Sequence, residues 1–308
     1  MSTKEELFAL RFGRKINIIQ DEKIENVHRF ILKSNYNSGY PENDRIPLSV
    51  YEGGNRGTVL FIHGTGHRNL KYLKWFPQTF PNYGFTGALM ILPYHFARTP
   101  AGYKSGELFL DPRTDPLRDR FENAVVDALT CIEFIKSRYP SPIYLMGYSF
   151  GGFISTISAA LEPSVKKLSL VVTGGNFYHI TWKSFATRVL RIRYEEDQTC
   201  NPEKCLNYHS EIYQEYLSKL KGPGIPFNSA PISCLEYDPL TYARFVKQPV
   251  LLLGAKFDIF IPKESTLQLF KTLPNARLKW IPSGHLSSIL FKKRIIKDSV
   301  SFFMDDFS

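Results

Sequence analysis

Short apolar runs alternate with longer amphipathic stretches from about residue 46 onward, and this alternation limits the fold more than any other feature. Six runs stand out, at residues 57–64, 86–94, 141–148, 167–175, 249–258 and 276–284. Several of them are apolar at nearly every position, which is typical of strands in a parallel sheet that helices cover on both faces. A further segment, residues 46–54, alternates more regularly, which favours a strand near an edge that pairs antiparallel.

Helical periodicity fills the gaps between these runs. Residues 116–138 carry apolar side chains at steps of three or four positions, and residues 150–161, 262–273 and 286–303 behave similarly. Strand and helix repeated in this order predict an α/β fold with a doubly wound, mostly parallel sheet.

The interval of about 70 residues between the predicted strands at 167–175 and 249–258 is too long for a simple crossover between neighbouring strands. It carries an apolar stripe at helical spacing, and a second helical run covers residues 204–221. We therefore expect residues 1–176 and 246–308 to form the core, with residues 177–245 inserted as a helical cap over the carboxyl ends of the strands. The alternative is that the inserted segment lies at the periphery, far from any functional site. Residues 1–45 carry no motif and are expected to add an edge strand or to pack under the sheet. The stripe consists of Trp182, Phe185, Ala186, Val189 and Leu190.

Composition narrows the class of protein. Hydrophobic residues make up 43% of the chain and charged residues 22%, which suits a folded domain with a sizeable core. No apolar run is long enough to span a bilayer, and the first residues mix acids and bases, so a cytoplasmic location is expected. The net charge of +10 is scattered without interleaved stacking aromatics, so no nucleic-acid partner is expected. The four cysteines do not have a metal-ligand spacing and are expected to be reduced and structural.

The pattern Gly147-x-Ser149-x-Gly151 joins an apolar strand to a predicted helix. In that setting a tight turn presents the serine as a nucleophile, and a side chain at either glycine would clash. The helix start also directs backbone N–H groups toward Ser149, which favours negative charge beside it. Three other motifs follow predicted strands: "FIHGTG" at residues 61–66, "LLLGAKFDIFIP" with Asp258, and "WIPSGHLSS" with His285.

With these motifs the chain resembles the α/β-hydrolase superfamily over roughly residues 46–305, the inserted segment excepted, and it is most similar to the dienelactone-hydrolase and acyl-peptidase-like esterases. The resemblance implies a catalytic triad of Ser149, Asp258 and His285, in the chain order of that fold. It also implies an oxyanion hole formed by the backbone N–H groups of Thr65 and Phe150. The alternative for Asp258 is helix capping, and the alternative for His63 is a metal site with His67; no metal is expected.

These roles predict a serine hydrolase that cleaves a small to medium, partly apolar carboxylic ester without a cofactor. The alternatives are an acyltransferase or a peptidase with the same triad, or a catalytically quiet fold that binds a ligand. A peripheral lipase, docked through basic residues such as Arg188, is the less favoured membrane alternative. The sequence does not determine the oligomeric state. Six residues are candidates for substrate binding: His67, Tyr94, His95, Tyr148, Phe177 and Trp182.

Overall fold

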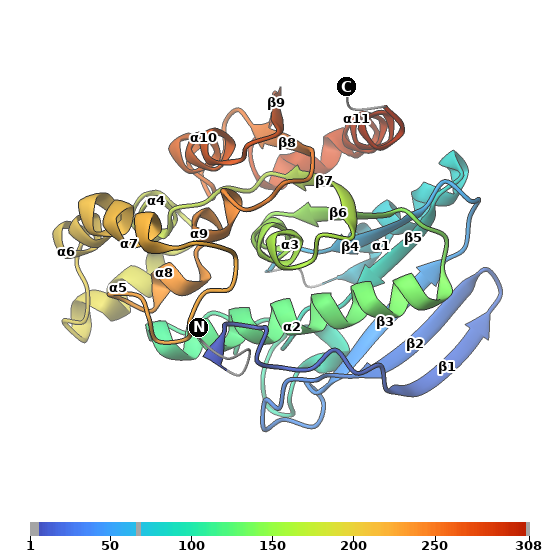
Figure 1. Ribbon diagram of the computed structural model, residues 1–308, viewed down its shortest axis with the longest axis horizontal. Coiled ribbons are helices and arrows are strands. Elements are labelled where there is room, and N and C mark those ends of the chain that lie inside the picture. The colour runs from blue at the N-terminus through green and yellow to red at the C-terminus, as the bar shows by residue number, and fades with distance from the viewer. Residues whose placement is uncertain (1–5, 66–68, 306–308) are drawn as a thin grey trace.

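Nine strands form one twisted sheet in the computed structural model, which describes residues 6–65 and 69–305 (Figure 1). The strand order is β1-β2-β3-β5-β4-β6-β7-β8-β9, and every pair from β5 to β9 is parallel. The bounds are β1 Ile18–Ile24, β2 Val27–Lys33, β3 Arg45–Tyr51, β4 Thr58–Ile62, β5 Thr86–Met90, β6 Ile143–Tyr148, β7 Val165–Val171, β8 Val250–Ala255 and β9 Ala276–Ile281.

Helices cover both faces of the sheet, and an apolar core lies on each face. Helices α2 (Thr114–Arg138), α3 (Phe150–Leu161) and α10 (Lys263–Thr272) pack on one face. Helices α1 (Leu70–Thr79) and α11 (Lys292–Met304) pack on the other. The prediction of a doubly wound, mostly parallel α/β fold is therefore confirmed. The remaining short helices of the core are η2 (Phe80–Tyr83), η3 (Phe96–Arg98) and η5 (Leu286–Phe291).

The amino-terminal residues extend the sheet beyond the parallel strands. Strands β1 and β2 form a hairpin, and β2 pairs antiparallel with β3, which pairs antiparallel with β5. Strand β3 is therefore antiparallel and near an edge as expected, with only β1 and β2 outside it. Every residue of β1 is exposed, so the outermost strand carries too little apolar patterning to be recognised from the sequence.

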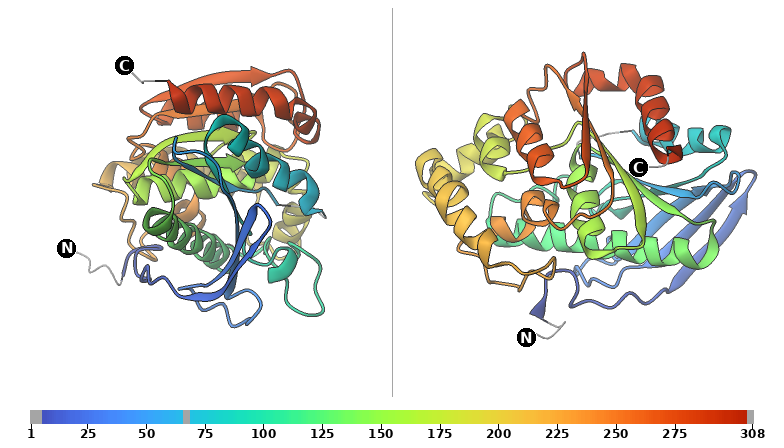
Figure 2. Two further views of the ribbon diagram at one scale, coloured as in Figure 1. Left: turned by 90° about the vertical axis from the view of Figure 1, so that its right-hand side faces the viewer. Right: turned by 45° about the horizontal axis from the view of Figure 1, so that its top comes forward.

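The inserted segment, residues 177–245, consists of short helices at the end of the molecule opposite the β1–β2 hairpin (Figures 1 and 2). Among the described residues no helix combines the length and apolar character needed to cross a membrane. The helices of the segment are α4 (Phe177–Lys183), α5 (Arg188–Glu196), α6 (Pro202–Asn207), η4 (Tyr208–Ile212), α7 (Tyr213–Lys219), α8 (Cys234–Tyr237) and α9 (Pro239–Ala243).

The apolar stripe predicted as one helix is divided between α4 and α5. Ser184 Oγ accepts a hydrogen bond from Ala186 N at 3.1 Å, and Thr187 Oγ1 donates to Ile180 O at 2.5 Å. Such bonds from hydroxyl side chains to the local backbone compete with the helical ladder and end it. Phe185 consequently points outward, with 62% of its surface exposed, and stacks on Phe260.

A single carboxylate holds together the two ends of the inserted segment. Asp238 accepts hydrogen bonds from the backbone N–H of Asn176 at 2.9 Å and of Phe177 at 2.7 Å, where the segment leaves the core. It also accepts from Leu240 N at 2.9 Å, where α9 begins. Burial raises the pKa of Asp238 to about 6, because the charged carboxylate has lost its contact with water.

Candidate active site

Ser149 lies at the sharp turn between β6 and α3. Its backbone has φ 54° and ψ −118°, a strained conformation for a residue other than glycine. Its N–H donates to Val171 O at 2.7 Å, which ties the turn to β7. A Cβ at Gly147 would lie 2.5 Å from Gly151 O, and one at Gly151 would lie 2.0 Å from Ile62 O. The steric requirement for glycine predicted from the sequence therefore applies at both positions.

His285 and Asp258 extend a chain of hydrogen bonds from this serine. Ser149 Oγ and His285 Nε2 are 2.8 Å apart, and His285 Nδ1 and Asp258 Oδ2 are also 2.8 Å apart. His285 is 9% exposed, so solvent reaches little of the ring. The structure thus brings together three side chains that lie up to 136 residues apart in the sequence.

The loops that carry Asp258 and His285 are joined to each other beyond the ends of their strands. Lys256 N donates to Ile281 O, and Phe257 N donates to Ser283 O, each at 2.9 Å. The second carboxylate oxygen, Asp258 Oδ1, accepts from Phe260 N and Ile261 N at 2.8 Å. The helix-capping alternative for Asp258 is wrong, because the N-cap of α10 is Pro262 and no side chain caps that helix. Oδ1 instead closes a local turn while Oδ2 faces His285, so the carboxylate has little freedom to rotate.

Ser288, which sequence reasoning missed, contacts the backbone of His285, and Tyr148, predicted only as a substrate contact, holds Ser288 in turn. Ser288 Oγ donates to His285 O, and the Tyr148 hydroxyl contacts Ser288 Oγ. Burial raises the pKa of Tyr148 to about 12, so its hydroxyl stays protonated at neutral pH. The ring of Phe260 packs 5.1 Å from the His285 ring, centroid to centroid. Ser288 follows His285 by three residues, one helical turn, and that spacing was the only available signal in the sequence.

The loop after β4 passes directly beside Ser149. A Cβ at Gly64 would lie 3.0 Å from Ser149 Cβ, which is closer than most side-chain contacts, so a larger residue would displace Ser149. Thr65 follows in the same loop and lines the cavity above Ser149. Phe150 is the first residue of α3, a position whose N–H has no acceptor within the helix. The two residues predicted for the oxyanion hole therefore lie on either side of Ser149.

His63 fixes this loop from the interior. The ring is fully buried, Nε2 accepts from Leu92 N at 3.0 Å, and Nδ1 lies 2.8 Å from Gly64 O. Because Nε2 accepts, Nδ1 carries the proton and donates it to Gly64 O. His67, the partner in the metal alternative and a candidate substrate contact, lies outside the described residues. Within the described ranges no group of three or more potential ligands is placed to hold a metal ion.

A cavity of about 800 Å³ opens above Ser149 and His285. Its walls come from α2, from α3 and from the inserted segment, and most of the lining side chains are apolar. The residues with the largest apolar side chains include Phe121, Phe153, Phe177, Ile180, Leu190 and Tyr237. Several of these rings pack edge to face, as Phe121 does on Phe177 with centroids 5.5 Å apart. The serine is therefore presented to an apolar, partly enclosed space.

The predicted substrate contacts divide into two groups. Tyr148 and Phe177 line the cavity, as expected. Tyr94 and His95 do not: both are buried in the core, with 2% and 0% of their surface exposed. Trp182 does not line the cavity either, and its ring packs against that of Tyr194, with centroids 6.4 Å apart.

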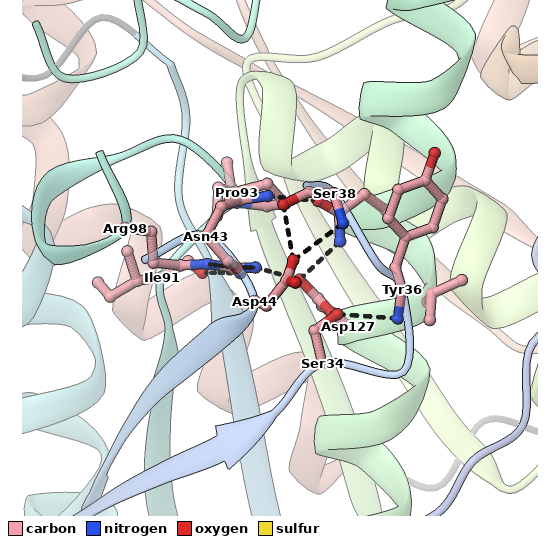
Figure 3. Close-up of polar contacts among 12 residues, drawn as sticks. Ser34, Tyr36, Ser38, Asn43, Asp44, Ile91, Pro93, Arg98 and Asp127 are labelled. Carbon is pink, nitrogen blue, oxygen red and sulfur yellow. Dashed lines mark hydrogen bonds and ion pairs between the residues drawn. The ribbon is translucent and has the colours of Figure 1, made fainter. Parts of the chain in front are cut away.

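The loop after β5 turns into the core because it is tied to a buried ion pair. Arg98 Nη2 donates to Asp127 Oδ2 at 2.6 Å, and both side chains are fully buried (Figure 3). Asn43 completes the cluster: its carbonyl oxygen accepts from Arg98 Nε at 2.9 Å, and its Oδ1 accepts from Tyr94 N at 2.8 Å. These bonds draw Tyr94 and His95 away from the cavity, which the polar sequence of the loop did not indicate.

Comparisons with known proteins bear on the fold. The family model described as "Alpha/beta hydrolase domain containing 18" matches residues 239–305, which include Asp258 and His285. Among solved structures, a cold-adapted esterase from an Arctic intertidal metagenomic library superposes with a TM-score of 0.57 at 17% identity, covering 94% of this chain and 97% of the other. The chain has the α/β-hydrolase fold.

Two further esterase structures superpose over similar lengths. The acetyl xylan esterase from Paenibacillus sp. R4 gives a TM-score of 0.56 at 16% identity, covering 94% of this chain and 88% of the other. Acetyl xylan esterase 1 from Thermoanaerobacterium sp. JW/SL YS485 gives 0.54 at 18% identity, covering 96% and 90%. No curated protein sequence matches the chain significantly.

Proposed function

We propose that this α/β-hydrolase is a serine esterase that cleaves a carboxylic ester with an apolar acyl or alcohol group. The observation that carries the proposal is the hydrogen-bonded series Ser149–His285–Asp258, with both distances at 2.8 Å, at the floor of an apolar cavity. Distances of this size are within the reach required for proton transfer between a nucleophile and its base.

The roles follow from the donors and acceptors. His285 Nε2 accepts the proton of Ser149 Oγ as the oxygen attacks the ester carbonyl, and the Nδ1 proton remains on the imidazole, directed at Asp258 Oδ2. His285 then returns the proton to the departing alcohol, and a water molecule activated by the same ring releases the acyl group. The N–H groups of Thr65 and Phe150 would stabilise the oxyanion, and each such donor typically contributes about 3–4 kcal/mol.

The cavity supports an ester as the substrate class. Its volume of about 800 Å³ lies within the range of ligand pockets, roughly 300–1,000 Å³. Its aromatic walls favour an apolar group over a sugar or a charged peptide. The structures compared above are described as esterases, which is consistent with this chemistry, although at 16–18% identity they bear on the fold alone.

The proposal is tested by release of p-nitrophenol from acyl esters of two to sixteen carbons. We expect turnover by the wild-type protein and its loss in Ser149→Ala. Ser301→Ala is the matched control, because Ser301 is exposed on α11, far along the chain from the site, and it should retain full activity. Equal activity in Ser149→Ala and the wild type would refute the proposal.

Labelling by a fluorophosphonate probe separates the alternatives. Labelling of Ser149 without ester turnover would favour acyl transfer or peptide cleavage by the same serine. Absence of both labelling and turnover would favour a catalytically quiet fold that binds a ligand. Asp258→Asn should reduce kcat by about 10⁴-fold with the fold intact, since the tautomer of His285 would no longer be fixed.

A further inference from the structure

Cys200 and Cys205 lie at the start of α6, and both line the wall of the cavity above Ser149. Asn201 is the N-cap of that helix: its side chain accepts from Lys204 N at 2.8 Å, and its carbonyl oxygen accepts from Cys205 N at 2.9 Å. Cys200 therefore occupies the position before the cap and Cys205 the fourth helical position. Side chains at these two positions typically pack against each other across the first turn.

The two thiols differ in what surrounds them. Cys205 is buried, whereas Cys200 is half-buried, and both line the cavity. A hydrogen bond with the Cys205 thiol lowers the pKa of Cys200, and the carbonyl of Asn201, 3.7 Å from Cys200 Sγ, lies beside it. The same contact and burial raise the pKa of Cys205. Cys200 is thus the thiolate-forming member and Cys205 its adjacent thiol, which is the arrangement of a reactive cysteine with a resolving partner.

The other two cysteines are built differently. Cys131 has no exposed surface, and burial raises its pKa. Cys234 also lines the cavity, but burial raises its pKa too, and its Sγ lies 3.5 Å from His209 Nε2. Neither is expected to react as a thiolate, so the reactivity of Cys200 can be compared with theirs in the same protein.

We propose that Cys200 and Cys205 are a reversible disulfide pair that responds to peroxide and closes on the wall of the Ser149 cavity. The Cys200 thiolate attacks one oxygen of the peroxide and becomes a sulfenic acid, releasing water once the other oxygen is protonated. The Cys205 sulfur then attacks the Cys200 sulfur and displaces a second water. Two thiols lose two electrons and two protons, and one peroxide is reduced to two waters. A dithiol reductant reverses the reaction by thiol–disulfide exchange.

Closing the bond would draw the two sulfurs to about 2.05 Å and pin the α5–α6 connection to the first turn of α6. Tyr194 and His209 line the cavity from the elements on either side of that connection. Oxidation of the pair would therefore restrain the part of the cavity wall that α5 and α6 form, and reduction would release it. The thiol chemistry is independent of whether the protein hydrolyses esters.

Tryptic mapping tests the pair directly, because Lys204 lies between the two cysteines. Each of the four cysteines falls in its own tryptic peptide: 121–136, 194–204, 205–219 and 222–244. The folded protein is treated with hydrogen peroxide, free thiols are blocked under denaturing conditions, and the digest is analysed by mass spectrometry. We expect peptides 194–204 and 205–219 to appear cross-linked, about 2 Da lighter than their sum, and to separate on reduction with dithiothreitol.

Two variants complete the test. Cys200→Ser should abolish the cross-link, whereas Cys234→Ser should form it as the wild type does. Alkylation of the untreated protein with iodoacetamide should modify Cys200 at least tenfold faster than Cys131. Oxidation of Cys200 to a sulfinic acid without a cross-link, or a cross-link between 205–219 and 222–244, would overturn the proposal.

Discussion

Replacing Arg98 by leucine should destabilise the fold severely, because it leaves a buried charge and two carbonyl oxygens without their donor. Arg98 donates to Asp127 Oδ2 at 2.6 Å, to Asn43 O at 2.9 Å and to Ile91 O at 3.0 Å. Neither side chain of the ion pair has any exposed surface. Removing one partner of a buried ion pair typically costs about 3–5 kcal/mol, and we expect Arg98→Leu to lower the free energy of unfolding by that amount.

The pH dependence of this loss has a definite sign. Burial raises the pKa of Asp127, and the neighbouring Arg98 lowers it in part. Without Arg98 the pKa of Asp127 rises further. A carboxyl whose pKa is raised by folding contributes stability that is complete below its unfolded pKa and is lost as the pH rises through the folded pKa. The deficit of Arg98→Leu relative to the wild type should therefore be smaller at pH 5 than at pH 8.

Urea denaturation at both pH values measures the effect, with the slope of the transition checked for constancy. The matched control is Arg113→Leu: Arg113 pairs with Asp111 at 2.8 Å but is 71% exposed, and such pairs contribute about 0–1 kcal/mol. The double variant Arg98→Leu with Asp127→Leu should be less destabilised than the sum of the single variants. A loss below about 1 kcal/mol, or a deficit that grows toward acidic pH, would refute the reasoning.

Three further predictions concern the site and the inserted segment. Asp238, whose pKa is raised to about 6, should contribute stability below about pH 4 that is lost as the pH rises through 6. Asparagine does not titrate, so the free energy of unfolding of Asp238→Asn, relative to the wild type, should rise by about 2–3 kcal/mol between pH 4 and pH 8 in urea titrations. Gly151→Ala places a Cβ 2.0 Å from Ile62 O, so this variant should lose fluorophosphonate labelling of Ser149, and full labelling would show that the turn relaxes. Phe177→Leu enlarges the cavity and should shift the preferred p-nitrophenyl ester toward longer chains; an unchanged chain-length profile would place the acyl group elsewhere.

The fold was predictable because the parallel strands are apolar on both faces. Strands β4, β6 and β8 are buried at every residue, so their sequences form continuous apolar runs that no amphipathic helix would produce. The glycines around Ser149 were informative for a related reason: the contacts at Gly147 and Gly151 exclude every side chain. Steric exclusion requires glycine at fixed positions, and burial on two faces requires continuous apolar runs, so both can be recognised in a sequence.

Features that depend on long-range polar contacts could not be predicted in the same way. Nothing near Tyr94 and His95 indicates that Asn43 and Asp127 draw their loop into the core. The break at Ser184 arises because Thr187 bonds to carbonyl oxygens of the preceding helix, while its apolar neighbours still follow the helical period. The position of Cys200 and Cys205 required the helix boundary at Asn201, which the periodicity of residues 204–221 did not give.

The hydrogen bonds of Asp238 also have a consequence for how this protein can vary. Asn176 and Asp238 are 62 residues apart in the chain yet share a hydrogen bond of 2.9 Å, so the polypeptide leaves the core and returns to it at one point. The residues between them are nevertheless part of the core: Tyr213 and Leu235 belong to the apolar cluster on the α2 and α3 face, and Glu236 pairs with Arg118 of α2. A shorter loop grafted between Asn176 and Asp238 would therefore have to replace these core contacts, and the segment can vary in length only where its helices are exposed.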